Sequence, residues 1–437
     1  MSIFSQLGRV KNFMKIAHLS DLHIGYATGR KKTNEGVNIR EQDGYDAFKE
    51  LVSQVIDESV DAVVVGGDIF HNPTPSIRSI VEVQAQFKRL ALAGISVYSV
   101  TGNHDTNDIA ADLSAALVIH DEDRKIFSHA EPYVKYEIAP DVYVHMISHH
   151  MFSAQSETMN NVKPVEGAIN ILTTHGSVID RILGIQLKAQ QSPREVVIPD
   201  FLLTDFKWDC IMLGHIHERG FVGEDTGSKI YNNAPILYNG SLIRRGFSDE
   251  EGELGRGWTL WEIDSAGNFS DKFFNVKQRP QYDLPVIEGG STDDVTAQLL
   301  HNIGSVMQTF DSDKLSEAPI VRQRFLNLSH AQKSGIQWSA VQPELANMLS
   351  WSISYKEDKD SQEKTDANTV DNENNVDSEG NRISTGNLIS DFDSWAKKDD
   401  NTSSVLSGIA EKKKENILTY SKDKVEEAYN KSLAQED

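Results

Sequence analysis

The sequence predicts an α/β fold, a β-sandwich with helices on its outer faces, and three observations lead to this prediction. Short apolar runs alternate with helical patterns through the first hundred residues, which is typical of βαβ units around a largely parallel sheet. Further apolar runs at 168–174 and 209–213 have the length and composition of buried strands. Five motifs that carry histidine or aspartate follow such runs, and a sandwich of this kind brings several strand ends to one edge.

The first half of the chain shows the alternation most clearly. Apolar runs at 15–20, 61–65 and 95–100 predict strands, and the one at 61–65 is short and rich in β-branched residues. Apolar residues at helical spacing predict helices at about 41–59 and at 76–93. These elements make up the parallel part of the predicted sheet.

The pattern changes after the third strand. Residues 133–138 and 142–147 flank Pro140-Asp141, and we interpret them as adjacent strands in an antiparallel pair. Residues 236–238 and 258–263 are interpreted as strands of a second sheet. The sandwich is expected to end near residue 280.

The rest of the chain is predicted to form separate parts. We expect a small α+β domain at 281–355, with helices at 292–310 and 340–349 and a strand at 320–328. Residues 356–387 are polar and acidic, so they bury too little apolar surface to offset chain entropy and are predicted to be a disordered linker.

Helical spacing returns in the last part of the chain, at 388–437. Leu418, Val425, Tyr429 and Leu433 lie on one stripe, which predicts a helix behind a flexible tether. Such a helix either docks on a partner or folds back on its own domain, and the residues leave both alternatives open.

Composition limits the class of protein. The formal net charge is −22, and 356–437 contributes −8 of it with 12 basic and 20 acidic residues. This acidity argues against tight metal-free binding of nucleic acid, although it does not exclude DNA as a substrate. The single cysteine rules out an intramolecular disulfide, no apolar run has the length of a membrane span, and 1–13 lacks the apolar core of a signal peptide. A cytoplasmic protein without membrane contact is therefore expected.

The five motifs supply the ligands for two divalent metals that share one carboxylate. Oxygen and nitrogen donors without a thiolate favour Mn²⁺, Zn²⁺ or Fe, and a pair of such ions catalyses hydrolysis at phosphorus. The candidate metal ligands are Asp21, His23, Asp68, Asn103, His175, His215 and His217.

Individual positions in the motifs suggest separate roles. Gly67 lets the chain turn at a strand end, so that Asp68 can bridge the metals with one oxygen on each. His104 follows a ligand without being needed as one, so it is the candidate catalytic acid, and Asp105 is predicted to orient its ring. His71 is a second candidate that either contacts substrate or only shapes the site.

The other histidines are interpreted as structural. His18, His120, His145, His149 and His150 lie on or beside predicted strands, where core or surface roles are commoner than metal binding. Cys210 lies within a predicted strand and is interpreted as a packed core thiol.

The motif series resembles the calcineurin-like metallophosphoesterase superfamily. Ile39-Arg40-Glu41 before Ala47-Phe48, the run from Gly67 to His71, and Tyr238-Asn239-Gly240-Ser241 before Phe247 resemble more narrowly the SbcD-type DNA repair nucleases. The resemblance covers residues 14 to about 280, and 281–355 would match the small capping domain of that family. One departure is Asn239, where the family often has proline.

The resemblance implies a fold and a complete site. The fold would be the metallophosphoesterase-type four-layer αββα sandwich, with 14–280 as nuclease domain, 281–355 as capping and DNA-binding domain, 388–437 as partner-docking helices and 1–13 as an extension. One metal would be held by Asp21, His23, Asp68 and His217, and the other by Asp68, Asn103, His175 and His215. Mn²⁺ is the implied metal, with His104 as catalytic histidine.

The resemblance also implies an activity and partners. The activity would be that of a 3′–5′ exonuclease on duplex ends and an endonuclease on single strands or hairpins, in DNA double-strand-break repair with an SMC-like coiled-coil ATPase. A homodimer would form through helices at 76–93 and roughly 108–118. The flanking residues of the second motif and the Arg40 loop favour DNA over other phosphoesters.

Two other functions use the same motifs. A phosphomonoesterase or phosphoprotein phosphatase is the main alternative, but phosphoprotein phosphatases usually carry Gly-Asp-x-x-Asp-Arg-Gly and Gly-Asn-His-Glu. This chain has His71 and Asp105 at the diverging positions. A metal-free scaffold would have lost ligands, whereas all seven are present.

Overall fold

The structure is a computed structural model, and the residues it describes are 13–106, 114–152, 160–178, 196–222, 230–231, 234–247, 255–289, 295–310 and 317–356. The chain divides into two units, 1–357 and 358–437. The second unit lies outside the described residues. The predicted linker, except for Lys356, and the predicted helices at 388–437 therefore lie outside them as well.

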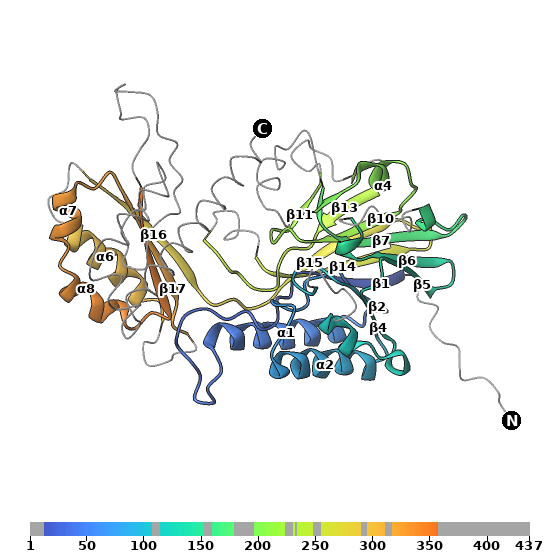
Figure 1. Ribbon diagram of the computed structural model, residues 1–437, viewed down its shortest axis with the longest axis horizontal. Helices are drawn as coiled ribbons and strands as arrows, with labels where there is room; N and C mark the ends of the chain where they lie inside the picture. The colour runs from blue at the N-terminus through green and yellow to red at the C-terminus, as the bar shows by residue number, and fades with distance from the viewer. Residues whose placement is uncertain are drawn as a thin grey trace, which may run out of the picture. The chain divides into compact units, whose positions relative to one another are not determined.

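The first sheet has six strands in the order β15-β14-β1-β2-β3-β4 (Figure 1). These strands are β1 (Phe13–Leu19), β2 (Ala62–Val65), β3 (Ser96–Val100), β4 (Ile126–His129), β14 (Gly257–Asp264) and β15 (Phe269–Asn275). The strands from β1 to β4 are parallel, and β14 pairs with β1 antiparallel. The predicted strands at 15–20, 61–65 and 95–100 are confirmed.

Two long helices, α1 (Ile39–Asp57) and α2 (Ile77–Leu92), cover the outer face of this sheet (Figure 1). Asn38 starts α1 by accepting hydrogen bonds from the backbone N–H groups of Arg40 and Glu41. Apolar residues of α1 at helical spacing, such as Phe48 and Val52, pack into one cluster with the outward side chains of the first sheet. Both predicted helices are confirmed.

The second sheet has seven strands, with six in the order β11-β13-β10-β7-β6-β5 and β12 paired to β13. They are β5 (Tyr133–Ala139), β6 (Val142–Ile147), β7 (Ile169–His175), β10 (Cys210–Gly214), β11 (Gly220–Phe221), β12 (Ile230–Tyr231) and β13 (Ala234–Tyr238). β5 and β6 are antiparallel as predicted, whereas β6, β7, β10 and β13 are parallel.

An apolar core lies between the two sheets. Ile16 and Val64 of the first sheet belong to one buried cluster with Val144, Met212 and Cys210 of the second. Side chains alternate between the two faces of a strand, so each sheet buries one set here and the other set under its outer helices. Cys210 is fully buried, which confirms that it is a core thiol.

Residues 258–263 lie in the first sheet, which corrects the expectation that they belong to the second. That segment is β14 of the first sheet, where it pairs with β1. Trp258 and Trp261 project to opposite faces of β14 and are both buried, one under the helices and one between the sheets. A strand that is apolar on both faces fits either sheet equally well, so its composition could not decide between them.

The outer face of the second sheet is covered by shorter elements. These are α4 (Asp200–Thr204), the 3₁₀ helix η4 (His149–Met151) and the paired strands β8 (Ser177–Val178) and β9 (Val197–Ile198). Leu202 and Trp208 pack there against Ile211 and Ile236. Two further 3₁₀ helices, η2 (Ala115–Ile119) and η3 (Glu122–Arg124), lead into β4. Much of the helix predicted at 108–118 lies outside the described residues.

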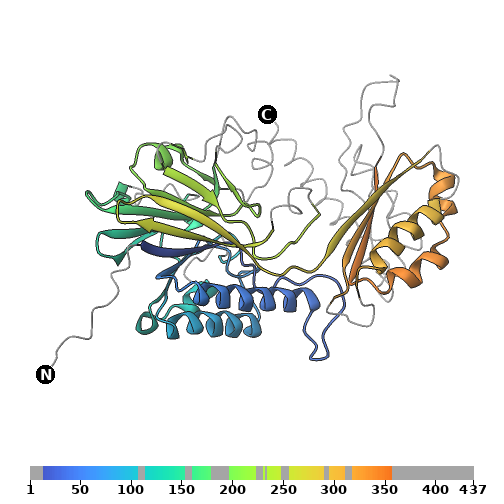
Figure 2. The ribbon, with the colours of Figure 1, turned by 180° about the vertical axis from the view of Figure 1, so that it is seen from behind.

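A small parallel sheet, in the order β16-β17-β18, follows the sandwich. Its strands are β16 (Gln281–Glu288), β17 (Ile320–Leu326) and β18 (Ser350–Lys356), and its helices are α6 (Val295–Met307), α7 (His330–Gly335) and α8 (Trp338–Leu345). The helices lie along one face of this sheet (Figure 2). The predicted strand and both predicted helices are confirmed, whereas β16, β18 and α7 were not predicted.

None of the helices in the described part of the chain is both long and apolar enough to cross a bilayer. The longest of them, α1, has a buried apolar face and a polar outer face instead.

Candidate metal centre

The five motifs lie at neighbouring strand ends, as the sequence predicts. Asp21 follows β1, Asp68 follows β2 and Asn103 follows β3 in the first sheet. His175 ends β7 and His215 follows β10 in the second sheet. Strands β1, β2 and β3 are parallel to one another, and so are β7 and β10, so the carboxyl ends of the strands in each set lie at one edge of their sheet.

Four of the candidate ligands have an unusual backbone conformation. Asp21, His23, Asp68 and His215 have φ angles of 50°, 45°, 53° and 106°, in a region that residues other than glycine rarely adopt. The strain is held by hydrogen bonds between the first two motifs, with Asp21 N–H donating to Gly67 O and His23 N–H to Asp68 O, both at 3.0 Å. Strain of this kind concentrates at functional sites.

One group of candidate ligands surrounds His23. Its Nε2 lies 3.1 Å from His217 Nε2, 3.6 Å from Asp68 Oδ2 and 3.9 Å from Asp21 Oδ1. Asp21 Oδ1 also lies 3.7 Å from His217 Nε2. These donor atoms therefore converge on one position.

A second group surrounds His175. Its Nε2 lies 2.9 Å from Asn103 Oδ1, 3.3 Å from His215 Nδ1 and 3.5 Å from Asp68 Oδ2. Asn103 Oδ1 and His215 Nδ1 are 3.3 Å apart. Asp68 is thus the residue that belongs to both groups.

The geometry of Asp68 differs from the expectation that each of its oxygens faces one metal. Oδ2 faces both groups, at 3.6 Å from His23 and 3.5 Å from His175. Oδ1 instead accepts a 2.8 Å hydrogen bond from the His104 backbone N–H. The sequence could not show this because the bond depends on how the third motif folds over the second.

The residues present fit a pair of divalent cations. Asp21 and Asp68 are both buried, and buried carboxylates require a compensating positive charge. The buried His and Asp clusters are consistent with a dimetal site. Nitrogen and oxygen donors without a thiolate suit Mn²⁺, Zn²⁺ or Fe. These seven residues would hold the ions, which when bound supply an activated water and neutralise charge on a phosphoryl group.

Asp68 and His175 stabilise each other's charged forms. Burial works against ionisation of Asp68, but the adjacent His175 holds the pKa of this carboxyl well below its usual range. Burial likewise opposes protonation of His175, yet Asp68 raises the pKa of its imidazole to about 9. His175 Nδ1 donates to Gly66 O at 2.8 Å, which orients Nε2 toward the site.

Asp105 does not orient the ring of His104, which corrects the prediction. Its carboxylate accepts hydrogen bonds from the backbone N–H groups of Ile69, Phe70 and Gly102, at 2.8 to 3.2 Å. Burial, followed by the charge of Asp68, raises the pKa of Asp105 to about 7. Asp105 therefore joins the second motif to the third, and its hydrogen bonds hold the backbone that directly follows Asp68.

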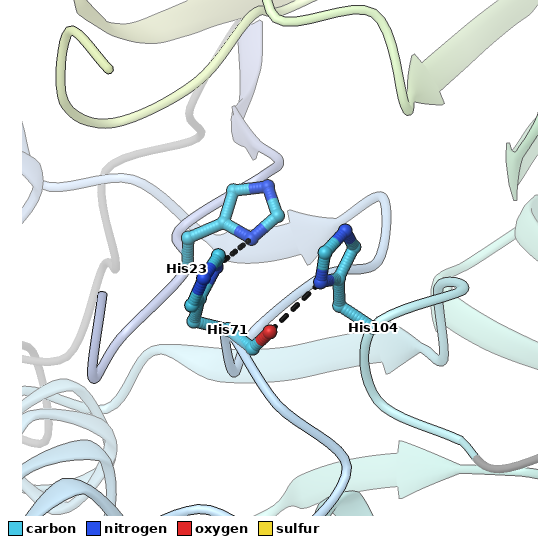
Figure 3. Close-up of side chains that lie close together, drawn as sticks. All are labelled: His23, His71 and His104. Carbon is cyan, nitrogen blue, oxygen red and sulfur yellow. Dashed lines mark hydrogen bonds between the residues drawn. The ribbon is translucent and has the colours of Figure 1, made fainter. Parts of the chain in front are cut away.

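His104 is oriented by a backbone carbonyl instead. Its Nδ1 donates to His71 O at 2.8 Å, and the rings of the two histidines stack at 5.3 Å (Figure 3). This bond turns His104 Nε2 away from the His71 backbone. The His71 ring is itself close to the site, because its Nδ1 lies 3.5 Å from His23 Nδ1 (Figure 3).

Sequence reasoning missed Arg245, which reaches the same site. Its Nη2 lies 2.6 Å from His217 Nε2, and its Nη1 lies 3.4 Å from His71 Nδ1. Burial and then Arg245 lower the pKa of His71 to about 4 and that of His217 to about 2. The position of Arg245, shortly after the Tyr238-Asn239-Gly240-Ser241 motif, was the available signal.

Arg40, by contrast, is a buried structural residue and not part of a substrate surface. Its guanidinium donates to Asp43 Oδ2 at 2.7 Å and to Arg244 O at 2.5 Å.

The other histidines lie outside the two ligand groups. His18 and His145 are buried in the sandwich, while His120 is partly exposed. His149 is closer than expected, because its Nδ1 donates to His175 O at 3.1 Å and so supports the backbone of a candidate ligand.

Comparisons with known proteins find similarity over part of the chain. Residues 14–219 match the family described as calcineurin-like phosphoesterase. The chain is also similar to two archaeal proteins named DNA double-strand break repair protein Mre11. The one from Methanocaldococcus jannaschii is 25% identical over 59% of this chain and 64% of its own length, and the one from Sulfurisphaera tokodaii is 28% identical over 61% and 64%.

The similarity to these relatives is partial, because it spans less than two thirds of the length of either. The family match covers the five motifs from Asp21 to His217 and the strands that carry them. Residues 14–219, which carry the five motifs, are therefore similar to the calcineurin-like phosphoesterases.

Proposed function

We propose that the protein is a two-metal-dependent DNA nuclease that acts in double-strand-break repair. The observation that carries the proposal is the pair of ligand groups that share Asp68, with His104 and His71 beside them. The name of the similar archaeal proteins supports DNA as the substrate. Mn²⁺ is the proposed metal, and the ligands are divided between the two ions as the resemblance implies.

The residues of this chain would act on a phosphodiester as follows. The carbonyl of His71 fixes the His104 ring, so that Nε2 can give a proton to the departing oxygen or a hydrogen bond to the phosphoryl group. Asp105 keeps the second and third motifs together through three backbone N–H groups. His71 lines the same side of the site and would contact the substrate.

The small domain at 281–355 is proposed to bind the DNA backbone. Arg322 and Arg324 lie on one face of its sheet, in register with Ser352 and Ser354 of β18. Asp283 is bonded to both arginines at 2.6 and 2.9 Å and offsets part of their charge. Hydroxyl and guanidinium groups on an accessible sheet face can contact phosphate oxygens.

The proposed activity can be tested with end-labelled duplex and hairpin DNA and the full chain in Mn²⁺. Wild type should cleave, and His104→Ala should lower kcat by about 100- to 10,000-fold, the usual range for a lost acid or base. Mn²⁺ affinity should stay close to wild type if His104 acts as the acid and is not a ligand, a distinction worth measuring because His104, His71 and His23 also have ring nitrogens within 4.8 Å of one another. His120→Ala is the control. Cleavage of phosphomonoesters but not of DNA, under every divalent metal, would replace the nuclease by a phosphatase.

Partner binding needs a separate experiment. We propose that 388–437 docks on an SMC-like coiled-coil ATPase. This partner would contribute positively charged DNA contacts, because the net negative charge of this chain disfavours DNA binding. Removal of 357–437 should abolish copurification with such an ATPase and leave Mn²⁺-dependent hydrolysis of a small phosphodiester intact. Equal retention of the ATPase by the truncated chain would contradict the docking role.

A further inference from the structure

Arg245 is a cationic side chain that lies against the candidate metal ligand His217. It lies in the loop after β13, is half-buried, and has Nη2 at 2.8 Å from His217 Nδ1 and 2.6 Å from His217 Nε2. Its other nitrogen, Nη1, faces His71. The guanidinium thus lies between a candidate ligand and a candidate substrate residue.

The guanidinium of Arg245 lies over the ring of Tyr26. The centre of the Tyr26 ring lies 5.8 Å from the Arg245 guanidinium carbon and 5.0 Å from the His71 ring, which it meets edge-on. A guanidinium over an aromatic face is attracted by the ring and keeps its N–H donors directed outward. Arg40 lies 5.9 Å from the same ring, but its donors serve Asp43 and a carbonyl.

The position of Arg245 disfavours metal binding when no substrate is bound. A guanidinium near His217 repels a cation held by that residue, so Arg245 weakens the metal site through charge. An anion that contacts both the cation and the guanidinium would remove this repulsion. A phosphate group is such an anion, and the planar fork of arginine matches two of its oxygens.

We propose that Arg245 binds a non-bridging oxygen of the substrate phosphate, on the His71 and His217 side of the site. The proposal rests on the proposed function and extends it by naming the residue that recognises the phosphate. Tyr26 then acts as a positioning residue, because it holds the plane of the guanidinium without contact to the substrate.

The test uses full-length Arg245→Gln and Arg245→Lys, with Arg124→Gln as a control that removes one positive charge from the exposed η3 segment. Calorimetry measures the affinity for Mn²⁺ alone and then for inorganic phosphate in saturating Mn²⁺. Arg245→Gln should bind Mn²⁺ several-fold more tightly and phosphate about 10- to 100-fold more weakly, the range for a lost charge-assisted hydrogen bond. Arg245→Lys should be intermediate for phosphate, and Arg124→Gln should match wild type.

Two results would overturn the proposal. The first is phosphate affinity of Arg245→Gln within twofold of wild type, and the second is weaker Mn²⁺ binding in that variant, which would show a structural role. The nuclease proposal can fail independently of this one. In that case wild type leaves DNA intact, while Arg245→Gln still binds phosphate more weakly than wild type. In that case Arg245 recognises the phosphate of a different ester.

Discussion

At the scale of single residues, the candidate metal centre depends on close backbone contacts at the strand ends. Gly102 lies against the Asp68 backbone and carboxylate, and Gly67, with φ of 93°, lies against the His175 ring. A side chain at either position would meet these atoms at less than 3.0 Å. The motifs therefore require glycine because the ligands pack against it.

The first prediction concerns Gly102. In Gly102→Ala the new Cβ would lie 2.2 Å from Asp68 Oδ1 and 2.6 Å from Asp68 N, so Asp68 must move. Displacement of a catalytic group by about 1 Å can cost about 100-fold in rate, and we expect a loss of at least that size together with weaker Mn²⁺ binding. Phosphodiester hydrolysis and calorimetry measure these two effects.

Gly94→Ala is the matched control for a general cost of replacing glycine. Gly94 has φ of 82° and has no atom within 4 Å of the position of a Cβ. It should lose about 1 to 2 kcal/mol of stability through backbone strain while its activity stays at the wild-type level. Equal loss of activity in both variants would mean that the contact with Asp68 is unimportant.

The second prediction concerns the pH dependence of stability. Burial lowers the pKa of His145 to about 4, and the neutral ring bonds to Tyr133 OH at 2.8 Å and Asn170 Oδ1 at 2.9 Å. Because the pKa is lower in the folded state than the value of about 6.5 in the unfolded chain, this stability is present above pH 6.5. It should be lost as pH falls toward 4, by up to about 3 kcal/mol.

Urea unfolding of wild type and His145→Gln at pH 7.5, 5.5 and 4.5 isolates this contribution. The free energy of unfolding should fall less steeply in the variant, since glutamine does not titrate. Parallel curves for the two proteins over this range would show that His145 does not contribute to the pH dependence.

At the scale of elements, Asp43 of α1 is connected through Arg279 to the segment that precedes β17. It accepts a bond from Arg40 and a bidentate pair from Arg279, whose Nε and Nη2 lie 2.6 and 2.7 Å from its oxygens. Arg279 also donates to Ala318 O at 2.6 Å. The Arg279 side chain is 3% exposed, so its charge is stabilised by partners within the protein, among them this carboxylate and the Ala318 carbonyl.

The third prediction follows from this pair. Asp43→Asn should destabilise the protein by about 3 kcal/mol, because it removes the negative charge that Asp43 places beside two largely buried guanidinium groups. Arg124→Gln removes the exposed ion pair with Asp121 and should cost less than about 1 kcal/mol. Urea unfolding compares the two variants, and similar losses in both would show that burial does not strengthen the Asp43 pair.

Element predictions from the sequence succeeded where the pattern was local. The β-branched run of β2 and the apolar spacing of α1 are sufficient to identify these elements. Strand β18 was missed although serine alternates there with Trp351, Ile353 and Tyr355, a pattern typical of a strand. Strand β16 carries Asp283, Pro285 and Glu288, so its composition does not favour a strand at all.

At the scale of the whole molecule, α2 presents apolar side chains to solvent. Ile77, Val81 and Leu92 are 81%, 56% and 79% exposed, and Val118 of η2 is 56% exposed. Exposed apolar residues that recur on one helix face are typical of an interface. They support the proposal of a homodimer that forms through α2 and its neighbour.

The fourth prediction tests that dimer. Val81→Glu should convert the protein to a monomer, because a charge would be buried at the centre of the interface. Phe201→Glu places the same charge at another exposed apolar residue, 42% accessible, and should leave the association unchanged. Sedimentation velocity measures the mass of each variant, and a monomeric wild type would refute the homodimer.

The sequence by itself determined the candidate ligands and the edge at which they meet. Each motif follows a strand of the parallel core, and parallel strands place their carboxyl ends together, so local pattern was enough. Tertiary structure alone decided which atoms contact each other: Asp68 Oδ2 faces both groups, Asp105 binds three backbone N–H groups, and Arg245 reaches His217. These contacts depend on the path of loops between distant segments, and residue identity alone does not specify that path.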